Sequence, residues 1–293
     1  SPFQFGLIYT GSDDGYINVT HNGGNTWARI SGNLPQDLWV SRVVASQHKK
    51  ERVYATLNGY RTDDFKTYVY VSNDMGKTWS SISSNVPNSP ANVIKEDPSN
   101  ANIIYLGTDN GVYVSFNNGG SWETFSNGLT NAAVHDLVIQ ADAKDLLVGT
   151  HGRSIYKANI AALQQYNKIS NKELALFKVP SLRSSSRWGS SWSQFSQVFK
   201  PSTTLQLYTK NAGKQVVKVM SEGGVELNSI SVNADKGFNY LEYDVTMTKS
   251  GKKALEKADK KVKISEAQNG KYYLPKGKYT IQVGEEKTDL IIK

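Results

Sequence analysis

The sequence has 293 residues, a formal net charge of +8 and no cysteine. Hydrophobic residues make up 38% and charged residues 20% of it, which is typical of a folded rather than a disordered chain. The missing cysteine excludes disulfides, zinc–thiolate sites and cysteine nucleophiles. No uncharged apolar run approaches the roughly 20 residues of a membrane-spanning helix, and no signal peptide is visible in the sequence.

Three segments in the first half share the pattern Ser/Thr-x-Asp/Asn-x-Gly-x-Ser/Thr-Trp, and we call them boxes. Their tryptophans are 52 and 43 residues apart, which is the length of one four-stranded propeller blade. The Asp or Asn suits a tight turn because its side chain accepts backbone N–H groups, and the glycine suits a positive φ. We expect the tryptophan to bury its ring between blades. The box residues are Thr20, Asn22, Gly24 and Trp27; Ser72, Asp74, Gly76 and Trp79; and Ser115, Asn117, Gly119 and Trp122.

A second repeat, with the composition of a β-hairpin, precedes the first and third boxes and occurs once more near 147–153. With strands lettered A to D from the innermost outward, the third repeat predicts strands near 92–97, 102–107, 111–115 and 121–126. The boxes then lie at the C-to-D turns. The second repeat is a variant with a longer loop, predicted from Asn58 to Lys66.

The other end of each blade, where B-to-C turns and D-to-A connections meet, is the end we expect to serve function. The residues predicted for this binding face are Asp13, Asp14, Trp39, Arg42, Arg61, Asp109, Asn110 and Arg153. Asp63, Asp64 and His151 lie on the same turns and are the weak catalytic candidates.

The predicted strands do not close a ring. The first repeat has no A strand and the last has no D strand, which gives three to four blades. An open propeller leaves unpaired edges and half-covered apolar faces. We therefore expect this chain to be the C-terminal part of a larger propeller, completed by an N-terminal remainder of the same precursor or by a separate chain.

The boxes and the sequence around them resemble the Asp-box (BNR) repeats of sialidases, xyloglucanases and sortilin-type receptors. The greatest similarity is to bacterial secreted proteins with a sortilin-like propeller, and it covers about residues 7–166. The stretches that carry it are 39–43, 59–66, 94–98 and 148–155. The resemblance implies a secreted, periplasmic or cell-surface bacterial protein. The end of the chain, 274–281, also resembles the C-terminal sorting domains of Bacteroidetes secretion.

Residues 167–293 carry a net charge of +10, against −2 for 1–166, and we place a domain boundary between them. About seven short alternating strands predict an immunoglobulin-like β-sandwich after a linker. A Ser-rich segment, 183–197, contains three aromatic residues, and it is either a binding loop or an arm that packs on the propeller. Lys249–Lys263 is a lysine-rich insertion with helix-forming residues. We do not expect nucleic acid to bind, because arginines and aromatics are not interleaved there.

The sequence favours a binding or assembly module over an enzyme. A glycosidase needs two carboxylates about 5–10 Å apart, and adjacent aspartates such as Asp63 and Asp64 are more often turn formers. The histidines are scattered, so we expect no metal and no cofactor. The expected ligand is a peptide, a protein or a glycan. The alternative is a glycoside hydrolase of the sialidase or xyloglucanase kind whose other catalytic residues lie in blades outside this chain.

Overall fold

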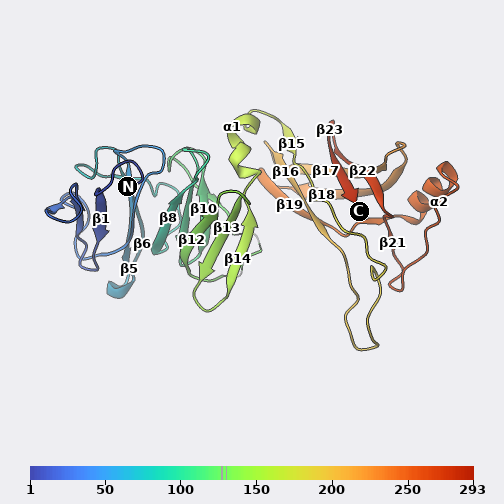
Figure 1. The fold of residues 1–293 in the computed structure, drawn as a ribbon, viewed down its shortest axis with the longest axis horizontal. Coiled ribbons are helices and arrows are strands. Elements are labelled where there is room, and N and C mark those ends of the chain that lie inside the picture. Colours follow the sequence, from blue (N-terminus) through green and yellow to red (C-terminus); the bar gives the residue numbers. More distant parts are fainter. Residues whose placement is uncertain (127, 130) are drawn as a thin grey trace. The chain divides into compact units, whose positions relative to one another are not determined.

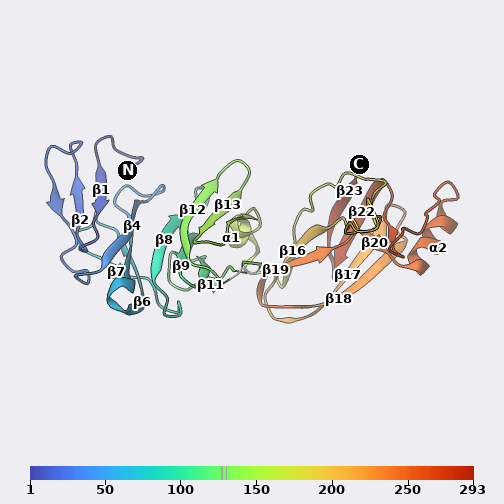
Figure 2. The ribbon, with the colours of Figure 1, turned by 90° about the horizontal axis from the view of Figure 1, so that it is seen from below.

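The computed structural model describes residues 1–126, 128–129 and 131–293. The predicted all-β class is confirmed: short antiparallel sheets follow one another along the whole chain (Figures 1 and 2). The chain divides into two compact units, Ser1–Gln164 and Gln165–Lys293. None of the helices in the described ranges is long and apolar enough to cross a membrane.

The first unit consists of four antiparallel sheets, each a meander whose strands pair in chain order. We number these sheets blades 1 to 4. Blade 1 has three strands, β1(Ile8–Gly11), β2(Ile17–Thr20) and β3(Ala28–Arg29). Blade 2 has four, β4(Trp39–Ala45), β5(Val53–Gly59), β6(Asp64–Ser72) and β7(Ser80–Ser81). Blade 3 has four, β8(Ala91–Glu96), β9(Ile104–Thr108), β10(Gly111–Ser115) and β11(Glu123–Thr124). Blade 4 has three, β12(Val134–Gln140), β13(Asp145–Thr150) and β14(Ile155–Asn159).

These strands confirm the assignment made from the repeats. In the described residues, blade 1 lacks an A strand and blade 4 lacks a D strand, and blade 3 has its four strands where the third repeat predicts them. The predicted loop from Asn58 to Lys66 is wrong in its extent. A 3₁₀ turn, η1(Tyr60–Thr62), closes it, and β6 already begins at Asp64 because Gly59 pairs with Asp64 across the turn.

Each box folds into the same hydrogen-bonded turn. In the second box the Ser72 hydroxyl accepts the Gly76 N–H at 2.7 Å, and Asp74 Oδ1 accepts both the Ser72 hydroxyl at 2.7 Å and the Thr78 N–H at 2.9 Å. The first and third boxes repeat all three bonds with Asn22 and Asn117 as acceptors. The box glycine has φ of +90° at Gly76, a conformation that favours glycine.

The box tryptophans fill the space between consecutive blades. Trp79 and Trp122 are 6% and 4% exposed, as the sequence predicts. Trp27 is 46% exposed, so the prediction of a buried ring is wrong for the first box. The reason is that the described chain places no sheet before blade 1.

Blades 2 and 3 also share a buried polar contact. The Glu96 carboxylate on β8 is 2% exposed and accepts hydrogen bonds from the Ser46 hydroxyl (2.8 and 2.9 Å), the Gln47 N–H (2.7 Å) and the Tyr54 hydroxyl (3.0 Å). A buried carboxylate is tolerated when it is hydrogen-bonded in this way. Desolvation of the Tyr54 phenol and the nearby Glu96 charge raise the pKa of that phenol above its ordinary value. This network fixes the two blades that carry most of the candidate site.

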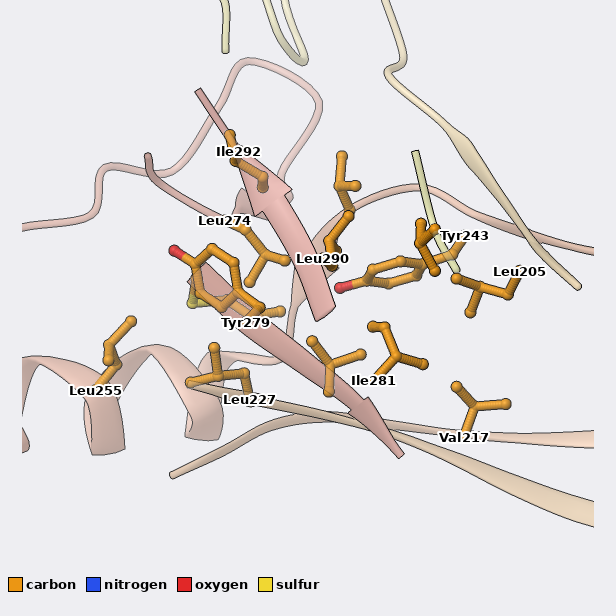
Figure 3. Packing of buried hydrophobic residues seen from close by; sticks show 14 of the residues in the cluster. Leu205, Val217, Leu227, Tyr243, Leu255, Leu274, Tyr279, Ile281, Leu290 and Ile292 are labelled. Carbon is orange, nitrogen blue, oxygen red and sulfur yellow. The ribbon is translucent and has the colours of Figure 1, made fainter. Parts of the chain in front are cut away.

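The second unit has two main sheets around one apolar core. One sheet has the order β15-β16-β19 and the other β18-β17-β22-β23. Leu205 and Tyr243 from the first sheet meet Val217, Ile281 and Leu290 from the second (Figure 3). Burial of each such side chain contributes about 1.5–3 kcal/mol. The strands are β15(Leu174–Leu176), β16(Thr203–Thr209), β17(Gly213–Ser221), β18(Glu226–Ala234), β19(Gly237–Tyr243), β22(Gly277–Val283) and β23(Glu286–Ile292).

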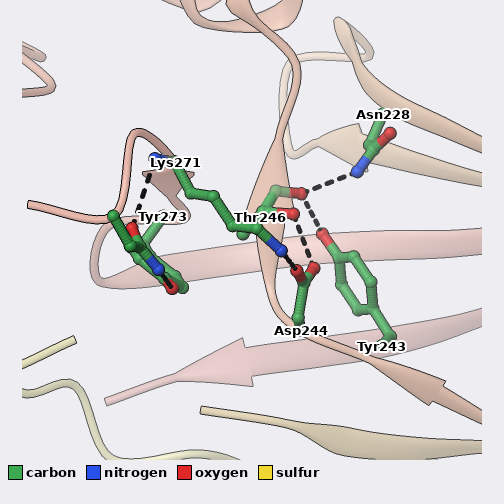
Figure 4. A network of polar contacts seen from close by, with 7 residues as sticks. Asn228, Tyr243, Asp244, Thr246, Lys271 and Tyr273 are labelled. Atoms are coloured by element: carbon green, nitrogen blue, oxygen red, sulfur yellow. Dashed lines mark hydrogen bonds and ion pairs between the residues drawn. The ribbon is translucent and has the colours of Figure 1, made fainter. Parts of the chain in front are cut away.

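Smaller elements complete this unit: η2(Leu163–Gln165) and α1(Tyr166–Ile169) lead into it, and β20(Thr246–Met247), β21(Tyr272–Tyr273) and α2(Lys249–Ala258) lie in the lysine-rich region. A polar network joins β19 to β20 and β21, in which Asp244 accepts the Lys271 ammonium at 2.6 Å (Figure 4). The Tyr243 hydroxyl and the Asn228 amide both donate to the Thr246 carbonyl, at 2.6 and 3.0 Å. Every group in this network has a partner inside the fold, which marks it as structural.

The Ser-rich segment between β15 and β16 projects from the unit as a long hairpin, yellow in Figure 1. Backbone hydrogen bonds join its two limbs, from Gly189 to the Phe199 carbonyl and from Phe199 to the Ser190 carbonyl. Trp188 is buried at its base, whereas Trp192 and Phe195 near its tip are 87% and 96% exposed.

Candidate functional site

A hollow of about 310 Å³ opens on the first unit at the end opposite the boxes. Blades 2, 3 and 4 all contribute to it, and they do so with the starts of A strands and with B-to-C turns. The residues that line it are Trp39, Asn58, Tyr60, Arg61, Asn92, Asp109, Ala133, His135 and His151. The hollow therefore brings together four of the residues singled out from the sequence: Trp39, Arg61, Asp109 and His151.

The floor of the hollow is a chain of side-chain amides that ends in a carboxylate. Asn58 Nδ2 donates to Asn92 Oδ1 at 2.7 Å, and Asn92 Nδ2 donates to Asp109 Oδ1 at 2.8 Å. Asn58 and Asn92 are 5% and 4% exposed, so these bonds are made away from bulk water. The chain crosses from blade 2 to blade 3 and holds Asp109 Oδ1 in a fixed direction. Asp109 Oδ2 is the second acceptor of this carboxylate.

Two imidazole rings form one wall. His135, on β12, and His151, in the turn after β13, have ring centroids 5.6 Å apart with the planes tilted by 48°. His151 is fixed through its backbone, because its N–H donates to the Ala133 carbonyl at 2.8 Å. Each imidazole offers a donor and an acceptor to a ligand. Within the described residues, no group of three or more His, Asp or Glu side chains is placed to hold a metal ion.

An aromatic ring and a cation form another part of the lining. The Arg61 guanidinium lies 5.2 Å from the centroid of the Trp39 ring, a cation–π distance, and it pairs with the Asp13 carboxylate at 3.4 Å. Both members of the ion pair are more than 60% exposed, so the pair contributes little stability. Tyr60 is also 60% exposed beside them. An apolar platform with a few directed polar groups is typical of ligand-binding hollows.

Arg42 lies on β4 outside the hollow. Its Nη2 pairs with Asp136 Oδ1 at 2.9 Å and reaches the His135 carbonyl at 3.5 Å, which links the innermost strand of blade 2 to that of blade 4. Its Nε is buried and makes no hydrogen bond among the described residues. Arg42 therefore contacts the backbone of His135 without lining the hollow.

The other predicted face residues do not line the hollow. Asp14 accepts a hydrogen bond from the Ser12 hydroxyl within its own turn. The backbone of Asn110 donates to the hydroxyls of Ser89 and Thr108, both at 3.1 Å. Arg153 is exposed in the turn after β13.

The two adjacent aspartates have turn-forming contacts. Asp63 adopts a left-handed conformation with φ of +56° and ends the 3₁₀ turn. Asp64 accepts the Tyr68 hydroxyl at 2.7 Å and the Lys66 N–H at 3.1 Å, and the Tyr68 bond lowers the pKa of its carboxyl. The same bond raises the pKa of Tyr68 to about 12. A general acid needs a raised carboxyl pKa, so the lowered pKa of Asp64 does not favour that role.

Sequence reasoning missed Asn58, Tyr60, Asn92, Ala133 and His135. Asn92 begins the A strand predicted near 92–97, where a polar residue is usually taken to face solvent, and His135 is only one of the scattered histidines. A signal was present, because Asn58 directly follows the apolar strand 53–57 and Asn92 begins the next one. The hydrogen bond between Asn58 and Asn92 forms only because blades 2 and 3 pack against each other.

The fold and this hollow define the class: a propeller-like protein of Asp-box blades with a hollow at the turn end. The family described as Sortilin, neurotensin receptor 3 (Sortilin-Vps10) matches residues 15–173, more than half of the chain. The chain belongs to this family. The search of curated proteins found no match.

Solved structures with a similar fold include three at low identity. The GH74 xyloglucanase from Xanthomonas campestris is 10% identical over 99% of this chain and 46% of its own, with a TM-score of 0.46. The Niastella koreensis GH74 enzyme is 14% identical over 83% of this chain and 37% of its own, with a TM-score of 0.45. YCF48 bound to D1 peptide is 11% identical over 97% of this chain and 78% of its own, with a TM-score of 0.37. The chain spans less than half the length of the two GH74 enzymes.

Proposed function

We propose that this protein is a binding or assembly module that holds an extended peptide, a protein segment or a glycan in the hollow of blades 2 to 4. The observation that carries the proposal is the convergence of nine residues from three blades on one hollow with a hydrogen-bonded floor. Its volume of about 310 Å³ lies near the lower end of the range of about 300–1,000 Å³ for ligand sites.

The lining suits a ligand with both an apolar face and many hydrogen-bonding groups. Trp39 and Tyr60 offer rings to pack on, while Asp109 and the two imidazoles offer acceptors and donors at fixed positions. A short stretch of peptide and a sugar residue both have this mixture. We place the protein outside the cytoplasm, as a secreted, periplasmic or cell-surface protein of a bacterium, on the family resemblance.

The test is a binding screen of the intact chain against an oligosaccharide array and an array of extended peptides. Ligands that bind should lose at least tenfold in affinity, or about 1.4 kcal/mol, on Trp39→Ala and on Asp109→Asn. The matched control is Phe5→Ser, which removes an exposed aromatic of the same unit outside the hollow. Equal binding by all four proteins would contradict the proposal.

The second candidate is a glycoside hydrolase whose remaining catalytic residues are supplied by further blades. Of the described residues that line the hollow, Asp109 is the one carboxylate, whereas both hydrolytic mechanisms use two. Hydrolysis of an array oligosaccharide that disappears in Asp109→Asn would support this candidate. Hydrolysis lost in Asp63→Asn or Asp64→Asn would instead place the chemistry at the adjacent aspartates.

A further inference from the structure

The projecting hairpin of the second unit is held at its base by close packing. Trp188 is 8% exposed, and its ring centroid lies 6.0 Å from that of Tyr273. Gly189, with φ of +75°, leaves no room for a side chain, since a Cβ there would lie 2.5 Å from Ala267 Cβ. The Asn269 N–H also donates to the Gly189 carbonyl at 3.1 Å. The base is therefore fixed to the turn that precedes β21.

The tip of the hairpin, residues 191–197, is a closed turn with two aromatic rings. The Ser193 N–H donates to the Ser196 hydroxyl at 2.8 Å, and the Ser196 N–H donates to the Ser193 carbonyl at 3.1 Å. Trp192 and Phe195 lie in this turn, and water reaches nearly the whole of both side chains. A packed base and a hydrogen-bonded turn thus present two large apolar rings to the surroundings.

The hairpin around these rings has no charge. Twelve consecutive residues, 188–199, contain no Asp, Glu, Lys or Arg, although 20% of the whole chain is charged. Serine, glutamine and glycine accompany the aromatic side chains. Because no ion has to lose its water, such a tip can enter apolar surroundings at low cost. Tryptophan is also the residue type that is enriched where lipid meets water.

Cations stand on both sides of the uncharged stretch. Arg187 precedes it directly and Lys200 follows it directly. Both are exposed, and neither is paired with a carboxylate among the described residues. No Asp or Glu occurs between Glu173 and Glu222, and residues 167–293 together carry a net charge of +10. The hairpin therefore combines an apolar tip with an uncompensated positive rim.

We propose that this hairpin docks the protein on a membrane surface that contains anionic lipids. Trp192 and Phe195 enter the boundary between headgroups and acyl chains, and Arg187 and Lys200 pair with lipid phosphates at its edge. Charge complementarity selects this occupant, because the surface of such a membrane is anionic and the layer beneath it is apolar. A neutral sugar could stack on the rings but would leave both cations unused. The proposal is independent of what binds in the hollow.

A dye at the tip tests insertion directly. Because the chain has no cysteine, Gln194→Cys gives a single thiol for a nitrobenzoxadiazole label, whose emission rises in apolar surroundings. We expect emission to rise with vesicles of equimolar phosphatidylcholine and phosphatidylglycerol, much less with phosphatidylcholine alone, and less as salt is raised. The same label on Lys236→Cys, in the exposed turn between β18 and β19, should not respond. A tip label that is already bright without vesicles would show that the tip is packed within the protein, and would overturn the proposal.

Sedimentation of the unlabelled chain with the anionic vesicles measures the contribution of each part. Trp192→Ser combined with Phe195→Ser should lower the partition coefficient at least tenfold, because both rings leave the interface. Arg187→Ser combined with Lys200→Ser should lower it about fivefold for each cation removed. All four side chains are exposed, so these variants should stay folded.

Matched controls come from the sheet β18-β17-β22-β23 of the same unit. Val216→Ser combined with Ile291→Ser removes two apolar side chains that are each 41% exposed. Lys214→Ser combined with Lys287→Ser removes two exposed lysines and the same net charge as the rim variant. Both controls should bind vesicles more tightly than their hairpin counterparts.

Three results would overturn the proposal. The first is a wild-type chain that does not bind the anionic vesicles. The second is an equal loss in hairpin variants and controls, which would assign binding to the overall charge or apolar surface. The third is a tip variant that loses binding to an oligosaccharide array while its vesicle binding is unchanged, which would assign the tip to a glycan.

Discussion

The Trp79 indole of blade 2 is hydrogen-bonded to the Ile30 carbonyl of blade 1, and the equivalent Trp27 of blade 1 has no such acceptor among the described residues. The same residue type in the same turn is therefore 6% exposed in one blade and 46% exposed in another. The difference comes from the neighbouring sheet and not from the box itself.

The first prediction follows from this difference. Trp79→Ala should lower the free energy of unfolding by about 3–5 kcal/mol, because it leaves a cavity between two blades. Trp27→Ala should lower it by about 1 kcal/mol or less, since half of the ring already contacts water. Urea unfolding of the isolated chain measures both values. Equal losses of unfolding free energy in the two variants would mean that Trp27 is covered in solution.

The second prediction concerns pH. Hydrogen bonds from Thr78 and Ser72 lower the pKa of Asp74 to about 2. A carboxyl whose pKa is depressed in the folded state contributes stability above its unfolded value near 3.9, and that stability is lost as the pH falls toward 2. The wild-type midpoint of unfolding should therefore fall between pH 5 and pH 2 relative to that of Asp74→Asn.

Asp74→Asn is a matched variant because the other two boxes carry asparagine. Asn22 Oδ1 and Asn117 Oδ1 accept the same backbone N–H, and their Nδ2 groups donate to the following hydroxyl. The variant should fold normally at pH 7. An identical pH dependence of the two proteins would show that the Asp74 bonds do not form in solution.

The third prediction concerns the first residue of the box. The Ser72 hydroxyl is buried and accepts the N–H groups of Gly76 at 2.7 Å and Asp74 at 3.3 Å. Ser72→Ala leaves these donors without an acceptor, which should cost about 1–3 kcal/mol. Ser72→Thr should cost far less, since Thr20 makes the same bonds in the first box. Thermal unfolding of the two variants compares them, and a neutral Ser72→Ala would contradict the prediction.

The fourth prediction separates the base of the projecting hairpin from its tip. Trp188 is buried with its ring centroid 6.0 Å from that of Tyr273, so Trp188→Ala should cost about 3–5 kcal/mol. Trp192→Ser and Phe195→Ser should change stability by about 0.5 kcal/mol or less, because both rings are exposed. Chemical unfolding measures all three. A large loss from either tip variant would show that the tip is packed against other residues.

Local patterns were sufficient to predict the blades. The box is an eight-residue motif whose hydrogen bonds stay within the turn, as those of Asp74 with Ser72 and Thr78 do, so its structure depends on nearby residues alone. The alternation of β strands and the repeat spacing also gave the strand order and the two incomplete blades. The predicted immunoglobulin-like class of the second unit stays a prediction.

The full set of residues in the candidate site could be identified only from the tertiary structure. Trp39, Asp109 and His151 could be named because they lie in turns that share one end of the blades. Asn58 and Asn92 could not, because their positions at the ends of apolar strands do not show which residues they face. They are 34 positions apart, and only the packing of blade 2 on blade 3 brings their amides to 2.7 Å. The sequence by itself determined the blades and their turns, since those bonds are local, whereas the meeting of side chains from separate blades was decided by how the sheets pack together.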